Sequence, residues 1–159
     1  MRSVRACIAL IAPLILGGCG YIHFGRLPDE LRRKAELVAQ VDAAIIAATR
    51  PGRTLGEIFQ HAVQAYARAG FPDEWRLHHQ GGLAGYEPRE ITVTPESTEA
   101  VSLGQAYAWN PSITGAKSED TILVTQNGND VLTETPGWPA LTANVGELAF
   151  TRPAIMELT

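Results

Sequence analysis

The side chains best suited to chemistry are concentrated between residues 78 and 90, in the stretch HHQGGLAGYEPRE. Three glycines fall within five positions of this stretch, and glycine lets a backbone turn sharply or approach another group closely. Polar side chains gathered on a loop are typical of binding and catalytic sites. The stretch therefore predicts a site, with candidate residues His78, His79, Tyr86 and Arg89. The alternative interpretation is a tight turn whose histidines and arginine hydrogen-bond buried carbonyl groups.

A second polar stretch, WNPSITGAKSEDT, lies between residues 109 and 121. Glu119 and Asp120 open a hydrophobic strand there, so strand alternation directs one carboxylate inward and the other outward. A buried carboxylate must be paired, hydrogen-bonded or bound to a metal. With the imidazole of His78 or His79, Glu119 supplies the first two ligands of a candidate metal site. Hydrolytic zinc sites use three protein ligands, so these residues alone do not complete one.

Two amphipathic helices precede these stretches and must help to position them. An apolar stripe with three- and four-residue spacing predicts a first helix from Pro28 to the Arg-Pro-Gly at residues 50–52. A second helix is predicted from Thr54, which has capping-box spacing to Glu57, to a stop at Gly70.

Short strands and turns dominate the chain after residue 72. The sequence Asn127-Gly128 between two apolar runs predicts a hairpin, and residues 21–24 are a candidate further strand at an edge. The other predicted strands cover residues 90–94, 105–109, 122–126 and 130–133. This order predicts an α+β fold with two helices on one face of a mainly antiparallel sheet.

The composition of the whole chain is that of a globular protein, with 159 residues, 45% hydrophobic and 19% charged. Its net charge is -4 and it has no cationic stripe. Nucleic acids bind through clustered lysine and arginine, so this charge argues against nucleic acid as a partner.

Residues 1–19 have a basic start, an apolar run and then Cys19, which is the pattern of a secretion signal. Leu16-Gly17-Gly18-Cys19 resembles the lipobox of bacterial lipoproteins, which predicts lipidation of Cys19 and a membrane tether. With this leader the protein would be membrane-anchored or periplasmic. The alternative is a chance leader from a displaced gene start, which would leave the protein cytoplasmic.

The two polar stretches, in this order and at this distance, resemble the pita-bread metallohydrolases, which include methionine aminopeptidase, Xaa-Pro aminopeptidase, prolidase and creatinase. The resemblance runs from about Tyr21 to Thr133 and includes HHQGG, YE, AWNP, EDTILVT and VLT, with RPG between the helices. It implies a partial pita-bread peptidase-like domain over residues 21–135. The leader would precede this half-domain, and residues 136–159 would follow it as a C-terminal tail.

In that family two Asp, one His and two Glu bind two divalent metals that activate a water. The resemblance gives His79 and Glu119 this catalytic, metal-binding role. Asn110 stands where the family has a glutamate, and a neutral amide binds divalent metals more weakly than a carboxylate. The candidate substrate contacts are His78, Tyr86 and Arg89. Because the two aspartates precede the region of resemblance, we expect an incomplete site without a cofactor. Manganese, cobalt or zinc would bind only if the site were completed.

Three functional interpretations follow from these residues. The first is a truncated Xaa-Pro aminopeptidase- or dipeptidase-like protein, weak or inactive as a metallohydrolase. The second is a non-catalytic binding module in which Arg89 and Lys117 hold a small carboxylate or a peptide terminus. In that case a partner chain, such as a second copy in a homodimer, would cover the exposed strand edge. The third is a lipoprotein of unknown role, or the product of a degraded or shifted reading frame.

Overall fold

The computed structural model describes residues 20–158, so the predicted leader and Cys19 lie outside the described residues. In chain order the elements are β1 (Ile22–Phe24), α1 (Asp29–Ala48), α2 (Leu55–Arg68), the 3₁₀ turn η1 (Glu74–Arg76), β2 (Gly81–Ala84), β3 (Ile91–Thr92), β4 (Ala106–Trp109), β5 (Ser112–Ile113), β6 (Ala116–Lys117), β7 (Asp120–Thr125), β8 (Gly128–Val131), β9 (Ala140–Val145), β10 (Leu148–Pro153) and β11 (Met156–Leu158). Neither described helix is long and apolar enough to cross a membrane.

Both predicted helices are confirmed. Helix α1 follows Pro28 and carries two acidic residues in its first turn, where they favour the positive end of the helix dipole. Helix α2 begins after Thr54 with the predicted capping box: the Thr54 hydroxyl accepts a hydrogen bond from the Glu57 backbone amide, and the Glu57 carboxylate accepts one from the Thr54 amide. The apolar stripes of both helices are buried in one core.

The capping box gives a first testable expectation. We expect Thr54→Ala to lower the free energy of unfolding by about 1 kcal/mol, because the backbone amide of Glu57 loses its acceptor and the Glu57 carboxylate loses the Thr54 hydroxyl as a donor. Urea denaturation followed by circular dichroism measures this change. Thr54→Ser keeps the hydroxyl and is the matched control, so equal losses in both variants would contradict the role of the cap.

A five-stranded antiparallel sheet in the order β3-β2-β4-β7-β8 forms the centre of the molecule. The predicted hairpin is confirmed, since β7 and β8 pair from Thr125 and Gly128 outward. The glycine-rich stretch, which sequence analysis interprets as a loop, is in part the strand β2 between β3 and β4. Strand β1, which was expected at an edge of the sheet, does not join it but pairs in parallel with β11.

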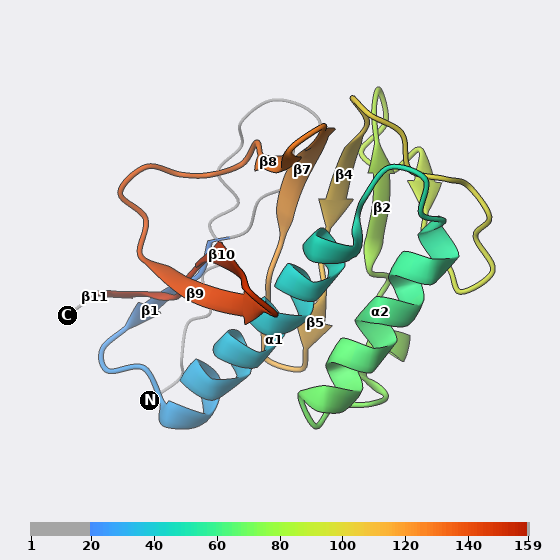
Figure 1. Ribbon diagram of the computed structural model, residues 1–159. Helices are drawn as coiled ribbons and strands as arrows, with labels where there is room; N and C mark the ends of the chain where they lie inside the picture. The colour runs from blue at the N-terminus through green and yellow to red at the C-terminus, as the bar shows by residue number, and fades with distance from the viewer. Residues whose placement is uncertain (1–19, 159) are drawn as a thin grey trace.

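Strand alternation divides the residues of the central strands between two faces. Tyr107, Trp109, Ile122 and Val124 point toward the helices and belong to the main core. Helices α1 and α2 lie together on this face of the sheet, as Figure 1 shows. The residues that alternate with these core positions, among them Ala108 and Thr121, are therefore directed to the opposite face.

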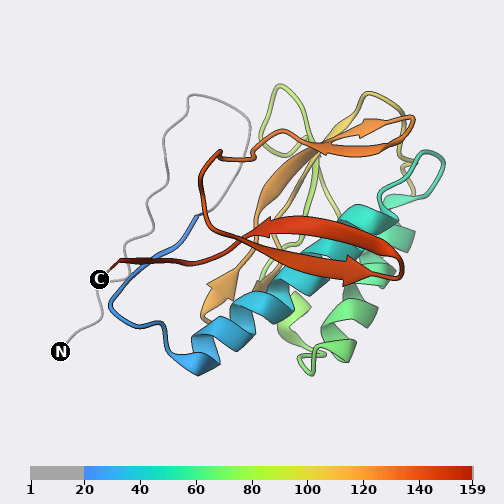
Figure 2. The same cartoon turned by 60° about the vertical axis from the view of Figure 1, so that its left-hand side comes forward.

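The residues after position 135 pack against the same core. The β9–β10 hairpin lies against α1, on the side of the sheet that carries the helices (Figures 1 and 2). Ala143 and Arg152 of this hairpin are buried, and Phe150 packs against the core. The chain then returns through β11 to β1, where Arg32 and Glu157 form an ion pair 2.7 Å long.

Candidate functional site

The middle of the sheet positions the candidate site. Gly81 of β2 and Asp120 of β7 both pair with Trp109 of β4, so three strands end side by side at this level. Trp109 and Asp120 face the helices. Asn110, the residue after β4, and Glu119, the residue before β7, are therefore directed to the opposite face. The two sequence-predicted residues Asn110 and Glu119 thus become neighbours although they are nine positions apart in the chain.

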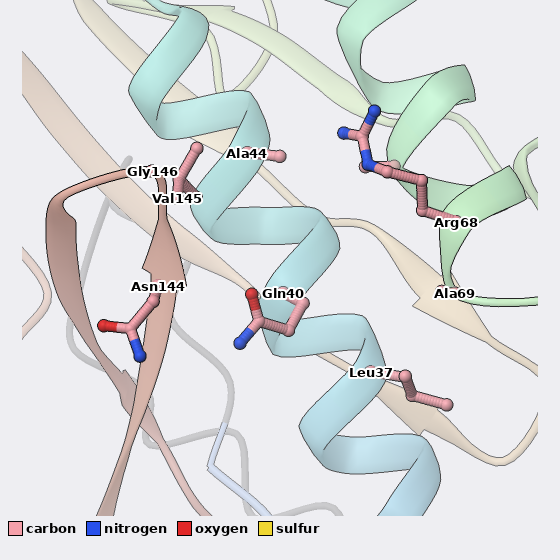
Figure 3. A pocket seen from close by; sticks show the side chains of 9 residues that line it. Leu37, Gln40, Ala44, Arg68, Ala69, Asn144, Val145 and Gly146 are labelled. Carbon is pink, nitrogen blue, oxygen red and sulfur yellow. The ribbon is translucent and has the colours of Figure 1, made fainter.

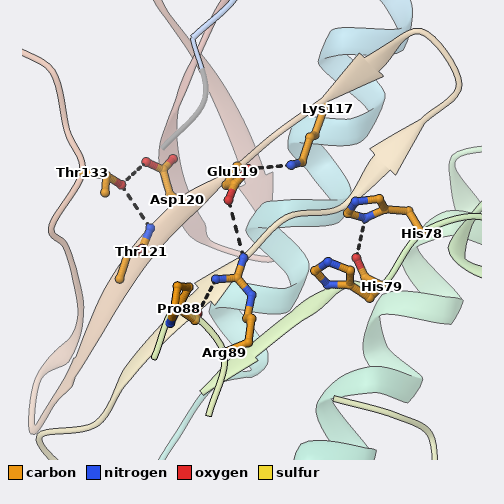
Figure 4. Close-up of polar contacts among 9 residues, drawn as sticks. All are labelled: His78, His79, Pro88, Arg89, Lys117, Glu119, Asp120, Thr121 and Thr133. Carbon is orange, nitrogen blue, oxygen red and sulfur yellow. Dashed lines mark hydrogen bonds and ion pairs between the residues drawn. The ribbon is translucent and has the colours of Figure 1, made fainter. Parts of the chain in front are cut away.

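Glu119 lies between two cations. Its Oε2 atom is 2.5 Å from Nζ of Lys117, and its Oε1 atom is 3.5 Å from Nη2 of Arg89 (Figure 4). All three side chains are at least three-quarters buried. Two positive groups and one negative group meet here, which leaves one excess positive charge in a partly desolvated place where charge interactions are strong.

Arg89 comes from the exposed turn between β2 and β3. Its Nη1 donates a hydrogen bond to the carbonyl oxygen of Pro88 at 2.6 Å, and Nη2 reaches Glu119. The Nε atom of Arg89 is buried and has no partner among residues 20–158, and the same is true of Oδ1 of Asn110. A guanidinium can bind a carboxylate through Nε and an Nη together. The site thus contains an unused donor and an unused acceptor.

The two histidines lie together beside this cluster. Their rings are stacked with centroids 4.5 Å apart, and Nδ1 of His78 is 2.6 Å from the carbonyl oxygen of His79 (Figure 4). Burial lowers the pKa of His79, and the positive charges of His78, Arg89 and Lys117 lower it further, against the opposing effect of Glu119. His79 is therefore expected to be neutral at pH 7, where it adds no charge to the cluster.

The structure brings most of the sequence-predicted residues into one region. His78, His79, Arg89 and Glu119 lie around Lys117, and sheet register places Asn110 beside Glu119. Tyr86 is different, because it is 89% exposed in the turn after β2. Of the two carboxylates that open β7, the inward one is Asp120, and Glu119 is the one on the site face.

Two buried charged residues that pair with each other near the start of β7 have no counterpart among the predicted ones. Asp42 of α1 and Arg152 of β10 form an ion pair of 3.0 Å, and Arg152 also pairs with Asp120 at 2.9 Å. The only sequence signals are an aspartate within the apolar stripe of a helix and an arginine within a short strand. Neither residue predicts its partner, because more than 30 residues separate Arg152 from both carboxylates.

The sequence of this chain matches a known protein family. A model of metallopeptidase family M24 matches residues 20–126. The chain belongs to this family. The M24 match covers both helices, the glycine-rich strand β2 and strand β7, so the resemblance described from the two polar stretches is confirmed.

Individual M24 relatives are longer than this chain. An agropine synthesis cyclase of Rhizobium rhizogenes is 34% identical over 113 residues, which is 67% of this chain and 28% of that protein. An uncharacterized peptidase of Staphylococcus epidermidis is 32% identical over 118 residues, or 71% of this chain and 34% of that protein. The chain therefore spans about a third of the length of these curated relatives.

Solved structures confirm the fold. A dipeptidase of Pyrococcus horikoshii superposes with a TM-score of 0.69 and 19% identity, over 90% of this chain and 37% of that one. An Xaa-Pro dipeptidase of Bacillus anthracis gives a TM-score of 0.67 and 20% identity, over 89% and 37% of the two chains. The predicted pita-bread half-domain, two helices on an antiparallel sheet, is thus confirmed.

M24 is a family of metallopeptidases, but the side chains of the described residues do not form a binding site for a pair of divalent metals. Within residues 20–158 no three His, Cys, Asp or Glu side chains form a group that could hold a metal ion. Lys117 and Arg89 occupy the two oxygens of Glu119, and Asn110 offers a neutral amide. Like unit charges 4 Å apart repel by about 4 kcal/mol near a protein surface. A divalent cation beside Glu119 would meet two such charges.

A separate hollow lies on the helix side of the M24 half-domain. Its volume is about 400 Å³, and it opens between α1, α2 and the turn of the β9–β10 hairpin (Figure 3). Its lining is formed by Leu37, Gln40, Ala44, Ala65, Arg68, Ala69, Asn144, Val145 and Gly146. None of the candidate site residues belongs to this lining, so the hollow and the Glu119 cluster are distinct features.

Proposed function

We propose that this M24 chain is a peptidase-like protein that binds a small carboxylate, such as a peptide C-terminus, and does not hydrolyse through a metal pair. The observation that carries the proposal is the placement of Glu119 between Arg89 and Lys117, which satisfies the one carboxylate of the cluster and leaves an excess positive charge. Such a cluster attracts an anion and repels a divalent cation.

The hydrogen-bonding groups of the site support a carboxylate more than another anion. Arg89 has a free, buried Nε beside an Nη2 whose contact with Glu119 is long at 3.5 Å. A planar carboxylate matches this edge of the guanidinium with two parallel hydrogen bonds. The free Oδ1 of Asn110 would accept a hydrogen bond from an N–H group of the same ligand. The dipeptidases among the solved relatives favour a peptide as the source of both groups.

Calorimetry with the dipeptide glycyl-L-proline tests the proposal. We expect saturable binding by the purified chain and a loss of at least tenfold in affinity for glycyl-L-prolinamide, which lacks the carboxylate. Arg89→Gln should weaken dipeptide binding by about 10- to 100-fold, because a hydrogen bond to a charged group contributes about 1.5–3 kcal/mol. Arg76→Gln is the matched control, since the exposed side chain of Arg76 lies over Trp75 and pairs with Asp73 rather than with Glu119.

Two outcomes would overturn the proposal. Equal affinity for the dipeptide and its amide would show that the carboxylate is not recognised. Stoichiometric binding of two Mn²⁺, Co²⁺ or Zn²⁺ ions together with hydrolysis of glycyl-L-proline would establish a metallohydrolase instead. Titration with each metal, followed by a dipeptidase assay on the metal-loaded protein, distinguishes this second result.

A further inference from the structure

A buried charge network lies directly beneath the Glu119 cluster. Arg152 of β10 is 2% exposed, and its Nη1 donates to Oδ2 of Asp42 at 3.0 Å and to Oδ2 of Asp120 at 2.9 Å. Its Nε donates to the carbonyl oxygen of Thr151 at 2.6 Å. Buried carboxylates need a partner, and one guanidinium serves both of them. The network therefore ties α1, β7 and the C-terminal hairpin together at a single point.

Both residues that flank Glu119 are held by this network. The hydroxyl of Ser118 donates to Oδ2 of Asp42 at 2.6 Å, and the carboxylate of Asp120 accepts from Arg152. Thr133 donates a further hydrogen bond to Oδ1 of Asp120 at 2.5 Å. Ser118 and Asp120 point inward, so the residue between them is directed outward, toward Arg89 and Lys117. The orientation of Glu119 is thus set by contacts on the opposite face of the strand.

We propose that Arg152 is a positioning residue for the Glu119 site, acting through Asp42 and Asp120 on the two residues that flank Glu119. The inference rests on the proposed function for the ligand, but the orientation of Glu119 in the free protein is independent of it. Arg152 lies after the residues 20–126 that the M24 model matches. The C-terminal hairpin, which contains Arg152, thereby contributes to the site.

The chemistry of the network explains why an arginine is needed. One planar guanidinium uses Nη1 for two carboxylates on different elements and Nε for its own backbone, a geometry that a lysine ammonium cannot reproduce. Without Arg152 the two buried carboxylates would separate or take up protons, and the backbone around Ser118 and Asp120 would move. A shift of one ångström in a supporting residue is enough to impair a binding site.

The test combines a spectroscopic signal with a binding measurement. The ¹³Cδ resonance of Glu119, assigned by its loss in Glu119→Gln, reports the two ion pairs in the ligand-free protein. We expect Arg152→Met to shift this resonance and to weaken glycyl-L-proline binding at least tenfold. Arg152→Lys should restore the resonance position and the affinity for glycyl-L-proline only in part. Ser118→Ala, which removes a single hydrogen bond, should weaken binding about threefold with a smaller shift of the resonance.

Phe150→Ala is the matched control on the same strand. Phe150 packs the hairpin against the core without contacting Asp42 or Asp120 in any hydrogen bond or ion pair of the described residues. This variant should lose stability while the Glu119 resonance and the affinity of the folded protein stay within twofold of the wild type. A merely structural role of Arg152 would make Arg152→Met behave in the same way, and that result would overturn the inference.

The remaining outcomes are also decisive. If Arg152→Met does not fold, Ser118→Ala tests the same link, and an unchanged Glu119 resonance in that variant would contradict it. If the wild-type protein does not bind glycyl-L-proline, the proposed function fails on its own. The resonance would still decide whether Arg152 positions Glu119.

Discussion

Replacing Arg152 with methionine is expected to lower the free energy of unfolding by about 3–5 kcal/mol at pH 7. Methionine fills a similar volume but leaves Asp42 and Asp120 buried without a positive partner. Breaking a buried ion pair by removing one partner is among the most destabilising single changes, because the remaining charge is neither solvated nor neutralised. Urea denaturation at several protein concentrations measures the loss.

Arg32→Met is the control for this variant. It removes the same charge by the same substitution, but the ion pair of Arg32 with Glu157 is partly exposed to solvent, where such pairs contribute little. We expect a much smaller loss of stability than for Arg152→Met. Similar losses in the two variants would mean that the Asp42–Arg152–Asp120 network does not stabilise the fold through its burial.

The same network predicts a pH dependence. Burial raises the pKa of Asp42, and it raises the pKa of Asp120 to about 6, against the opposing effect of the Arg152 charge. When the pKa of a carboxyl group is higher in the folded protein than its unfolded value of 3.8, the free energy of unfolding falls as the pH rises between these two values. Without Arg152 both pKa values rise further, so this loss continues to higher pH. The difference in stability between wild type and Arg152→Met should therefore be smaller at pH 5 than at pH 7.

Gly81→Ala is expected to lower the free energy of unfolding by about 2–5 kcal/mol, from backbone strain and from overlap in the sheet. Gly81 has φ = +108°, which residues with a Cβ rarely adopt, and an added Cβ would overlap the carbonyl of Ala108 on β4. Because this overlap is with backbone, no side-chain rotation relieves it. Thermal unfolding by calorimetry measures the effect.

A second glycine separates the two causes. Gly52, between the helices, has φ = +84° and no atom within 4 Å of an added Cβ. Gly52→Ala should therefore show the backbone strain alone, at about 1–2 kcal/mol. If Gly81→Ala costs no more than Gly52→Ala, then close approach of β2 and β4 is not the reason for glycine at position 81.

The parts of the fold that could be predicted from sequence are those specified by local chemistry. Apolar residues at helical spacing and the pair Thr54 and Glu57 determine both helices, and Asn127-Gly128 marks the hairpin, because these signals act within a few residues. The glycine-rich stretch shows where local signals fail. Its glycines do allow close approach, as predicted, but at Gly81 and Gly82 the approaching groups are the backbones of neighbouring strands.

The residues of the site could be predicted from sequence, but the balance of their charges could not. His79, Arg89 and Glu119 could be selected because polar side chains are concentrated around them. That Glu119 is saturated by two cations depends on the turn after β2 reaching the strand β7, 30 residues further on. Arg152 is still more remote, at 110 residues from Asp42. Contacts at such separations follow from the sheet order, which no short motif specifies.

The pairing of β1 with β11 has a consequence for the synthesis of this protein. The amide of Leu27, just after β1, donates to the carboxylate of Glu157 on β11 across 130 residues of chain. Ribosomes add about 5–20 residues per second, so β1 leaves the ribosome on the order of ten seconds before its partner strand. Over that interval Asp42 also lacks Arg152. Among the described residues, closure by residues 148–158 is therefore expected to be the last step of folding.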